Sequence, residues 1–324
     1  MPCDEFVPVV TADVLAEHNQ GRDRGAYYYD DDYKHDAGPW IEFRARCEPA
    51  LRKRVKPGEF VLNSCGGLQA LAGNVGGLDI EYIVGYSGTH SKRRVFPSHN
   101  WRHVVLGMYR QEKSPEWNDA VIPHYLDMAD WPMREPDRVG EHMLFLGRLG
   151  DHKGLGLAAK VAQECGVKLL VSGLLSPGQK IEDVLPRGRH VVWAGPSDHA
   201  KRVALLSEAR CLFAASRYTE PFGMVVIEAG AVGCPVVTTD WGAFPEIVQH
   251  GTTGYRCNDF EEFVNAVDNA PSIYDDACRQ RVMENYSLDA VWPQYDAYFR
   301  RVTKSLTKDG WYWLPMKEHA SAVT

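Results

Sequence analysis

Short runs of apolar residues alternate with helical patterns along the second half of the chain. The runs are nearly continuous, which is typical of strands buried on both faces of a sheet. The segments between them have helical spacing, among them one that ends at Cys165 and one over residues 197–209. This alternation predicts a parallel sheet with helices on both faces. The predicted strands are residues 142–149, 167–173, 190–195, 210–216 and 235–239.

The first half of the chain shows the same alternation with weaker patterning. An apolar stripe predicts a helix over residues 40–55, which Pro57-Gly58 ends. Strands are predicted at residues 6–10, 60–63 and 80–85. The whole chain is therefore predicted to be an α/β protein.

Two loops of the first half follow predicted strands. Gly66 and Gly67 come after residues 60–63, and glycines there let a phosphate or a sugar approach the backbone. The loop at residues 86–90 follows the next strand and ends at His90. Because ligands of open α/β sheets bind at the carboxyl ends of strands, this second loop is the better candidate for lining a cleft. His90 is equally compatible with a surface histidine beside basic residues.

A proline-punctuated stretch, residues 131–137, separates the two halves and indicates an interdomain linker. The chain of 324 residues is long enough for two domains, each with its own core. Apolar and aromatic residues at helical spacing predict a closing helix after residue 286. We predict domains at residues 1–137 and 138–286, a helical segment at 287–306 and a tail at 307–324.

The segment from Glu220 to Thr239 holds the most distinctive pattern. It begins Glu-Pro-Phe-Gly, continues as an apolar helix that contains Glu228, and ends in a turn and a strand. A helix N-terminus binds anions, and carboxylates accept hydrogen bonds from hydroxyl groups, so the pattern fits a ligand with both phosphates and sugars. Either acid, taken alone, is also explained by a helix with an acid near its start, which the macrodipole favours.

A basic pair, Arg148 and Lys153, follows the first strand of the second half. Arginine makes forked contacts with phosphate oxygens, and lysine adds a compact charge. Taken alone, the pair is also compatible with surface charges at a strand end and a helix start.

Together these motifs resemble those of retaining glycosyltransferases of family 4, which have the GT-B fold. The resemblance rests on Glu-Pro-Phe-Gly followed by Glu228, on Gly-Cys-Pro-Val-Val at 233–237, on Pro-Glu at 245–246, and on the Gly-Arg-Leu and Lys-Gly pairings at 147–154. It implies two Rossmann-like domains whose parallel sheets face a central cleft, with a terminal helix that crosses back to the first domain. Residues 84–88 and 239–242 also resemble short versions encoded by bacteriophages. The sequence departs from the family where Gly242-Ala243-Phe244 replaces paired glycines and where His124-Tyr125 replaces Asn-Gly.

The resemblance implies a role for each residue of the motifs. Arg148 and Lys153 would hold the donor pyrophosphate, while Glu220 would hold the transferred sugar and Glu228 the ribose. Gly195 lies where the family places the nucleotide base, and His90 is nearest to a histidine that the family has beside the sugar. No metal or other cofactor is expected, because the two cations and helix N–H groups stabilise the leaving nucleoside diphosphate. The remaining residues of the expected donor site are Phe222, Gly223, Met224, Val225, Gly66 and Gly67.

Composition and charge restrict the setting. Apolar residues make up 44% and charged residues 24%, as in soluble globular proteins, and no apolar run approaches the roughly 20 residues of a membrane span. The acidic start does not resemble a signal peptide, so we expect a cytoplasmic protein. The eight cysteines are scattered singly, so neither disulfides nor a zinc site is expected. An aspartate run at residues 30–32 suits an exposed loop better than a metal site.

The sequence predicts a retaining, metal-independent glycosyltransferase that moves a sugar from a nucleotide-sugar donor to a hydroxyl group of a protein or glycan. One alternative is transfer to a hydroxymethylated pyrimidine in DNA. If a bacteriophage encodes the chain, the expected location is the cytoplasm of its host. The net charge of −7 counts against that acceptor, whereas basic runs at residues 52–56 and 92–94 are either an acceptor-side patch or a solvated face. Another GT-B enzyme, such as a phosphorylase or epimerase, and a non-catalytic nucleotide-sugar-binding protein are further alternatives.

Overall fold

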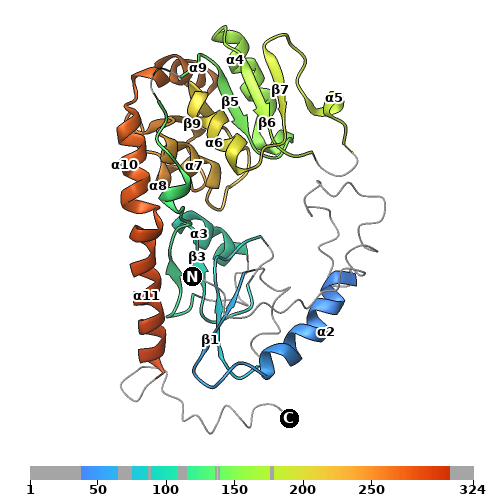
Figure 1. The fold of residues 1–324 in the computed structure, drawn as a ribbon, viewed down its shortest axis with the longest axis vertical. Coiled ribbons are helices and arrows are strands. Elements are labelled where there is room, and N and C mark those ends of the chain that lie inside the picture. Colours follow the sequence, from blue (N-terminus) through green and yellow to red (C-terminus); the bar gives the residue numbers. More distant parts are fainter. Residues whose placement is uncertain are drawn as a thin grey trace.

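The computed structural model describes residues 38–64, 75–86, 89–108, 115–135, 137, 139–175 and 179–306. They form two α/β units stacked along the long axis of the molecule, and helices α10 and α11 run along one side of the stack (Figure 1). The predicted strand at residues 6–10, the aspartate run, and Gly66 and Gly67 lie outside the described residues.

The second unit is built on a six-stranded sheet in the order β10-β9-β8-β5-β6-β7. All neighbouring strands pair in parallel, which confirms the predicted parallel sheet. The five predicted strands form, and the sequence analysis missed β10, a short edge strand whose apolar pattern is weak. The strands are β5 Met143–Leu146, β6 Leu169–Ser172, β7 Val191–Gly195, β8 Cys211–Ala214, β9 Val236–Thr239 and β10 Gly254–Cys257.

Alternate side chains of β5 enter two separate cores, because successive residues of a strand point to opposite faces. Leu144 and Leu146 pack with α6 and α7, whereas Met143 and Phe145 pack with α4 and α9. The sheet is therefore covered on both faces, as predicted. The helices are α4 Leu155–Glu164, α5 Ile181–Val184, α6 His199–Glu208, α7 Met224–Val232, α8 Phe244–Ile247, α9 Phe260–Asn269 and α10 Asp275–Asn285.

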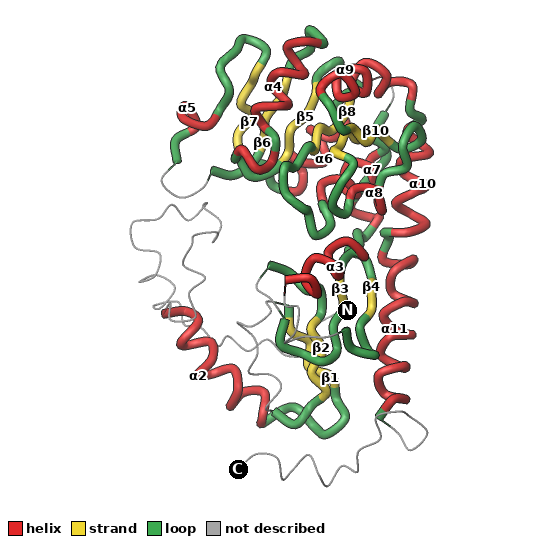
Figure 2. Tube along the Cα trace, turned by 180° about the vertical axis from the view of Figure 1, so that it is seen from behind, coloured by secondary structure: helices red, strands yellow, loops and turns green. Residues whose placement is uncertain are grey.

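The first unit contains a smaller parallel sheet (Figure 2). Strand β1 pairs with β2 and β3 with β4, and a bridge between Glu81 and Arg94 joins the two pairs. The predicted strand at 80–85 is wrong at its carboxyl end. The strand ends at Glu81, and Ile83 adopts a φ of 57°, which a β-branched residue in a strand does not. The elements are α2 Gly38–Arg52, β1 Phe60–Asn63, β2 Leu78–Glu81, β3 Val95–Phe96, α3 His99–Met108, β4 Ala120–Val121 and the 3₁₀ helix η2 Met128–Asp130.

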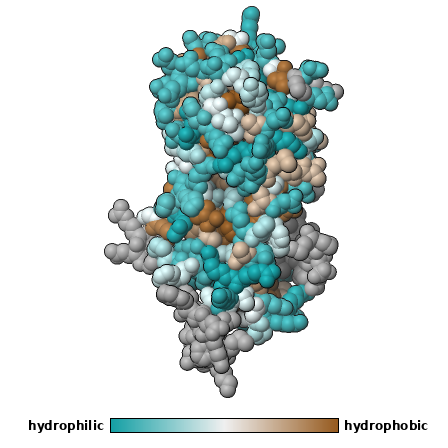
Figure 3. Space-filling model, turned by 90° about the vertical axis from the view of Figure 1, so that its left-hand side faces the viewer, coloured by the Kyte–Doolittle hydropathy of each residue, from teal (hydrophilic) through white to brown (hydrophobic). Residues whose placement is uncertain are grey.

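Helix α11, Leu288–Ser305, lies against the first unit. Its buried residues Val291 and Tyr295 share a core with Ile80 and Val95 of the small sheet. The side of α10 and α11 that faces away from the two units is turned toward the viewer in Figure 3, where apolar residues interrupt a mostly hydrophilic surface. Within the described part of the chain, no helix is long and apolar enough to cross a bilayer. The domain boundaries at residues 137 and 286 stay predictions.

Candidate active site

A pocket of about 450 Å³ lies between the two units. Its second-unit wall is formed where β5 and β8 end, and this is where ligands of open α/β sheets bind. Its first-unit wall comes from residues 83–86, Pro97 and His124. The second unit contributes Phe145, Leu146, Gly147, Arg148, Lys153, Phe213, Ala214, Ser216, Glu220, Pro221, Phe222, Gly223, Met224, Val225 and Phe244.

Glu220 is the centre of a hydrogen-bonded cluster in this wall. Its Oε1 accepts from Lys153 Nζ and, at 2.9 Å, from Ser216 Oγ. Its Oε2 accepts from the hydroxyl group of Tyr218 at 2.7 Å. Only 7% of Glu220 is exposed. The two motifs that lie 67 residues apart in the sequence thus meet at a single ion pair.

Tyr218 is a member of this cluster that the sequence analysis missed. Its hydroxyl group lies 2.6 Å from Lys153 Nζ, and the ammonium group also lies 4.8 Å from the centre of the tyrosine ring. Burial, reinforced by the negative charge of Glu220, raises the pKa of Tyr218 far above its usual range. The phenol therefore remains a hydrogen-bond donor at all physiological pH values. Its position two residues before the Glu-Pro-Phe-Gly motif is the sequence feature that could have predicted this role.

The start of α7 borders the pocket through Gly223, Met224 and Val225. Gly223 has a φ of 95°, and a Cβ atom there would lie 2.7 Å from the ring of Phe244. Only glycine therefore fits, and it lets the chain turn directly into the helix. The N-cap residue is a glycine, and within the described part of the chain no side-chain cap bonds to this helix N-terminus, so its first N–H groups are suited to an anion. The ring of Phe222 instead packs at 5.0 Å from His124 across the two units.

Glu228 lies on α7 and is 4% exposed. Arg202 donates a hydrogen bond of 2.7 Å to its Oε1, and Oε2 has no hydrogen-bond partner among the residues described. Burial raises the pKa of Glu228, while the charges of Arg202 and then His199 oppose that rise. Glu228 is not among the described residues that line the pocket. A buried oxygen that still needs a donor fits the expected contact with a hydroxyl group.

Two neighbouring side chains of α6 contact the surroundings of Gly195 and Glu228. Gly195, like Glu228, is not among the described residues that line the pocket. Lys201 donates to the carbonyl groups of Ala194 and Pro196, on either side of Gly195. Its neighbour Arg202 bonds to Glu228. The sequence analysis missed this basic pair. A helix dipole disfavours cations in a first turn, so two adjacent cations there indicated that compensating acceptors lie nearby.

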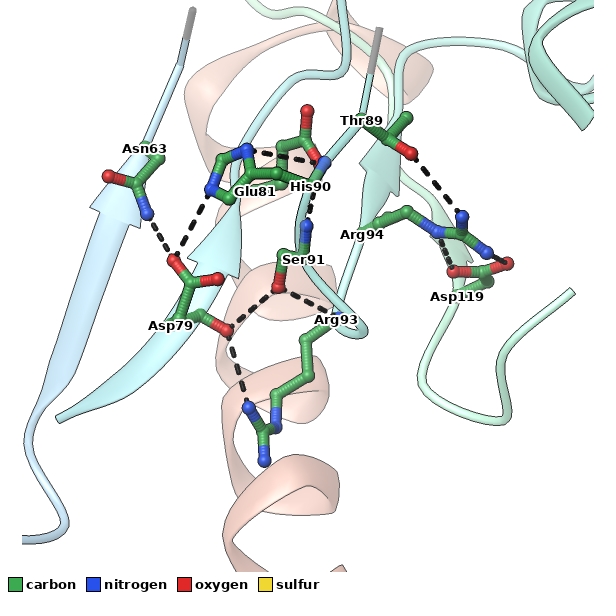
Figure 4. A network of polar contacts seen from close by, with 9 residues as sticks. All are labelled: Asn63, Asp79, Glu81, Thr89, His90, Ser91, Arg93, Arg94 and Asp119. Atoms are coloured by element: carbon green, nitrogen blue, oxygen red, sulfur yellow. Dashed lines mark hydrogen bonds and ion pairs between the residues drawn. The ribbon is translucent and has the colours of Figure 1, made fainter. Parts of the chain in front are cut away.

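His90 lies in a polar cluster of the first unit (Figure 4). Its N–H donates to Glu81 Oε2 at 3.0 Å, and its ring nitrogens lie 3.7 Å from Asp79 Oδ1 and 3.9 Å from Glu81 Oε2. Ser91 Oγ donates to the backbone carbonyl of Asp79 at 3.1 Å. Burial raises the pKa of Glu81. The cluster ties the end of the loop after β2 back to β2, and His90 is not among the described residues that line the pocket.

Two second-unit residues next to the pocket bond directly to the start of α3. Ser98 Oγ donates to the carbonyl of Pro221 at 2.7 Å. The carboxylate of Glu246 accepts from the N–H groups of His99 and Asn100 at 2.9 and 2.8 Å. A carboxylate at a helix N-terminus is favourable, so these contacts hold the two walls of the pocket together.

Part of the chain is similar to known glycosyltransferases. Residues 140–270 match the family described as "Glycosyl transferases group 1". A glycogen synthase of Mycobacterium tuberculosis is 32% identical over 197 residues, which cover 53% of this chain and 46% of the relative. An N-acetyl-alpha-D-glucosaminyl L-malate synthase of Bacillus anthracis is 30% identical over 146 residues, 42% of this chain and 36% of the relative. The chain thus spans less than half the length of both relatives.

Solved structures resemble a larger share of the chain. AviGT4, a glycosyltransferase involved in avilamycin A biosynthesis, superposes with a TM-score of 0.66 at 24% identity, over 81% of this chain and 78% of its own. Anabaena HepE in complex with UDP and glucose gives 0.65 at 14% identity, over 79% and 80%. These likenesses confirm the predicted GT-B fold. The roles of the individual site residues stay predictions.

Proposed function

We propose that this chain is a retaining glycosyltransferase of family 4 that transfers a sugar from a nucleotide-sugar donor to a hydroxyl group of a glycan or protein. The observation that carries the proposal is the meeting of Lys153 and Glu220 in the wall of the interdomain pocket, with Arg148 beside them in the lining. A cationic pair and a carboxylate in one wall suit a ligand that has both a diphosphate and a sugar.

The donor would lie with its diphosphate between the basic pair and the start of α7. Arg148 and Lys153 supply two positive charges, and the N–H groups of Met224 and Val225 add oriented dipoles. These groups stabilise the negative charge that develops on the leaving nucleoside diphosphate, so the reaction requires no metal ion. Glu220 would orient the hydroxyl groups of the transferred sugar, and Glu228 Oε2 would accept from the ribose.

The transfer itself exchanges one bond at the anomeric carbon for another. The bond between that carbon and the donor phosphate oxygen breaks as the acceptor oxygen forms its bond on the same face of the sugar. The acceptor proton passes to the departing phosphate oxygen, which leaves as nucleoside diphosphate. Attack and departure on one face give retention of configuration.

Uridine diphosphate is the first nucleotide to test, because HepE is solved with UDP and with UDP-glucose. A thermal-shift screen would compare UDP, GDP, ADP and dTDP, since a ligand that binds only the native state raises Tm. We expect one nucleotide to raise Tm and Glu228→Ala to reduce that rise. If none of the four raises Tm at millimolar concentration, the donor site is wrongly assigned.

Turnover would then be measured as release of nucleoside diphosphate in the presence of acceptor. Lys153→Ala should lose most turnover and keep its fold, whereas Lys160→Ala, an exposed lysine on the adjacent α4, should keep both. Near-normal turnover in Lys153→Ala would contradict the mechanism. A cytoplasmic location and an origin in a bacteriophage stay predictions from the sequence.

A further inference from the structure

Tyr86 places an exposed aromatic ring at the pocket. It lines the pocket from the first unit, and 55% of the residue is exposed. The ring leaves apolar area in contact with water in the pocket wall, and covering such area with a ligand is favourable. Tyr86 therefore presents apolar area to the pocket.

The described residues on both sides of Tyr86, before it in the chain and at residues 89–91, are each fixed by their surroundings. Ile83 takes a φ of 57°, and a strained backbone at a pocket persists only where its surroundings fix it. The carboxylate of Glu81 accepts from the N–H groups of His90 and Ser91 and so anchors the far end of the loop (Figure 4). The rings of Tyr86 and Trp101 form a T-shaped pair with their centres 5.4 Å apart and their planes at 69°, and Trp101 is 6% exposed. The ring is thus positioned before any ligand arrives, which lowers the entropic cost of binding.

The hydroxyl group of Tyr86 connects the ring to the proposed donor site. It lies 3.1 Å from the hydroxyl group of Tyr218, which in turn donates to Glu220. The residues that the proposed mechanism uses to bind the donor, from Arg148 to Glu228, belong to the second unit, whereas Tyr86 belongs to the first. A ligand that covers the Tyr86 ring is therefore next to the transferred sugar and on the acceptor side of it.

The chemistry of this corner suits a pyranose ring. One side offers an aromatic face for the apolar C–H face of a sugar, and the other offers hydroxyl and carboxylate groups for the sugar hydroxyls. A nucleobase also stacks on aromatic rings, but DNA needs cations for its phosphates, and the chain carries a net charge of −7. We propose that Tyr86 is the stacking platform of an acceptor subsite and that the acceptor is a carbohydrate. This inference rests on the proposed function, which left protein and glycan acceptors open.

Two variants separate stacking from the hydroxyl contact. Tyr86→Ala removes the ring, and Tyr86→Phe keeps the ring but removes its hydroxyl group. Tyr274→Ala is the matched control, because Tyr274 is 81% exposed on the second unit and outside the pocket lining. Each full-length protein would be applied to an array of oligosaccharides with UDP present, and any glycan bound would be titrated by calorimetry. UDP affinity would be titrated in parallel.

We expect the array to identify at least one glycan that binds the unmodified protein. Tyr86→Ala should weaken its binding by about tenfold or more, which is the scale of one aromatic contact. Tyr86→Phe and Tyr274→Ala should bind it within about twofold of the unmodified protein, and UDP affinity should be unchanged in all three. As an acceptor substrate, the glycan should show a raised KM in Tyr86→Ala.

Other outcomes would overturn the inference. It fails if Tyr86→Ala binds the glycan normally, if it loses UDP affinity to the same extent, or if the array shows no binding while UDP binds. It also fails if an oligonucleotide with hydroxymethylcytosine binds in place of any glycan. The protein could bind a glycan through Tyr86 and yet bind none of UDP, GDP, ADP and dTDP. That result would uphold the subsite and refute the proposed transferase.

Discussion

The ion pair between Arg202 and Glu228 gives a prediction that can be worked from the structure. The carboxylate is almost fully buried, and the Arg202 side chain that bonds to it at 2.7 Å is 35% exposed. Arg202→Ala would leave the buried carboxylate without the hydrogen-bond donor that it has among the residues described. We therefore expect this substitution to destabilise the second unit and to weaken nucleotide binding.

The size of the effect follows from burial and distance. Removing one partner of a fully buried ion pair costs about 3–5 kcal/mol. Because a third of the Arg202 side chain is in contact with water, solvent screens the pair and the expected cost falls to about 2 kcal/mol. For a unit of this size, that cost corresponds to a decrease in Tm of about 4–8 °C.

The pH dependence of the loss identifies its cause. Burial raises the pKa of Glu228 in the folded protein, and removal of Arg202 raises it further. An acid with a raised pKa in the folded state binds more protons folded than unfolded, so stability falls as pH rises through that pKa. The deficit of Arg202→Ala should therefore be largest near pH 8 and should shrink as the pH is lowered toward 5.

Urea unfolding followed by tryptophan fluorescence at both pH values would measure the deficit. Arg189→Ala, an exposed arginine of the same unit, is the control and should change little. The double variant Arg202→Ala/Glu228→Gln should recover part of the loss, because it removes the buried charge. An equal deficit at pH 5 and pH 8, together with no recovery in the double variant, would refute the reasoning.

Three further predictions use other contacts near the pocket. Gly223→Ala should lower the free energy of unfolding by about 1–3 kcal/mol and weaken UDP binding, because the new Cβ atom would meet the ring of Phe244. The control Gly251→Ala also has a positive φ, 76°, but open space around the new Cβ atom, so it should cost less. Equal costs of the two substitutions would contradict this prediction. Glu246→Gln should lower the free energy of unfolding by about 1–2 kcal/mol, since an amide oxygen cannot replace a carboxylate that accepts two N–H groups at the start of α3; an unchanged urea midpoint would contradict this. Burial lowers the pKa of His124 from 6.5 to about 4. Between pH 6.5 and pH 4 the unfolded chain therefore binds a proton at this histidine that the folded chain does not. The free energy of unfolding should fall by up to about 3 kcal/mol as the pH decreases over this range. His124→Gln should reduce that dependence in a urea series, and an identical slope in the variant would exclude His124 as its source.

Much of the second unit could be predicted from the sequence. The apolar runs that became β5, β6, β8 and β9 are buried on both faces, so their composition alone excludes an exposed strand. Edge strand β10 lacks such a run, since its two central residues are polar or only half-buried, and backbone pairing with β9 forms it. The position of Arg148 at the carboxyl edge also followed from local order, because it comes two residues after the end of β5.

The candidate site shows where local pattern stops being informative. Because His90 follows a predicted strand, the sequence predicts that it lies near the cleft. In the structure its ring lies beside Asp79 and Glu81 of the first unit. These acids lie two residues apart on one strand, so the sequence predicts that they share a face of the sheet. It does not predict which loop covers that face. Among the described residues after that strand, Ile83, Val84, Gly85 and Tyr86 line the pocket.

The sequence by itself determined most of the strands and helices of the second unit, the fold class and the motif residues that lie beside the pocket. These features depend on residue period, burial and turn chemistry, which act over a few residues. Only the tertiary structure decided which motif residues touch, as in the contact of Lys153 with Glu220, of Arg202 with Glu228 and of Tyr86 with Tyr218. Those pairs are 67, 26 and 132 residues apart, so their contacts depend on how whole helices, loops and units pack.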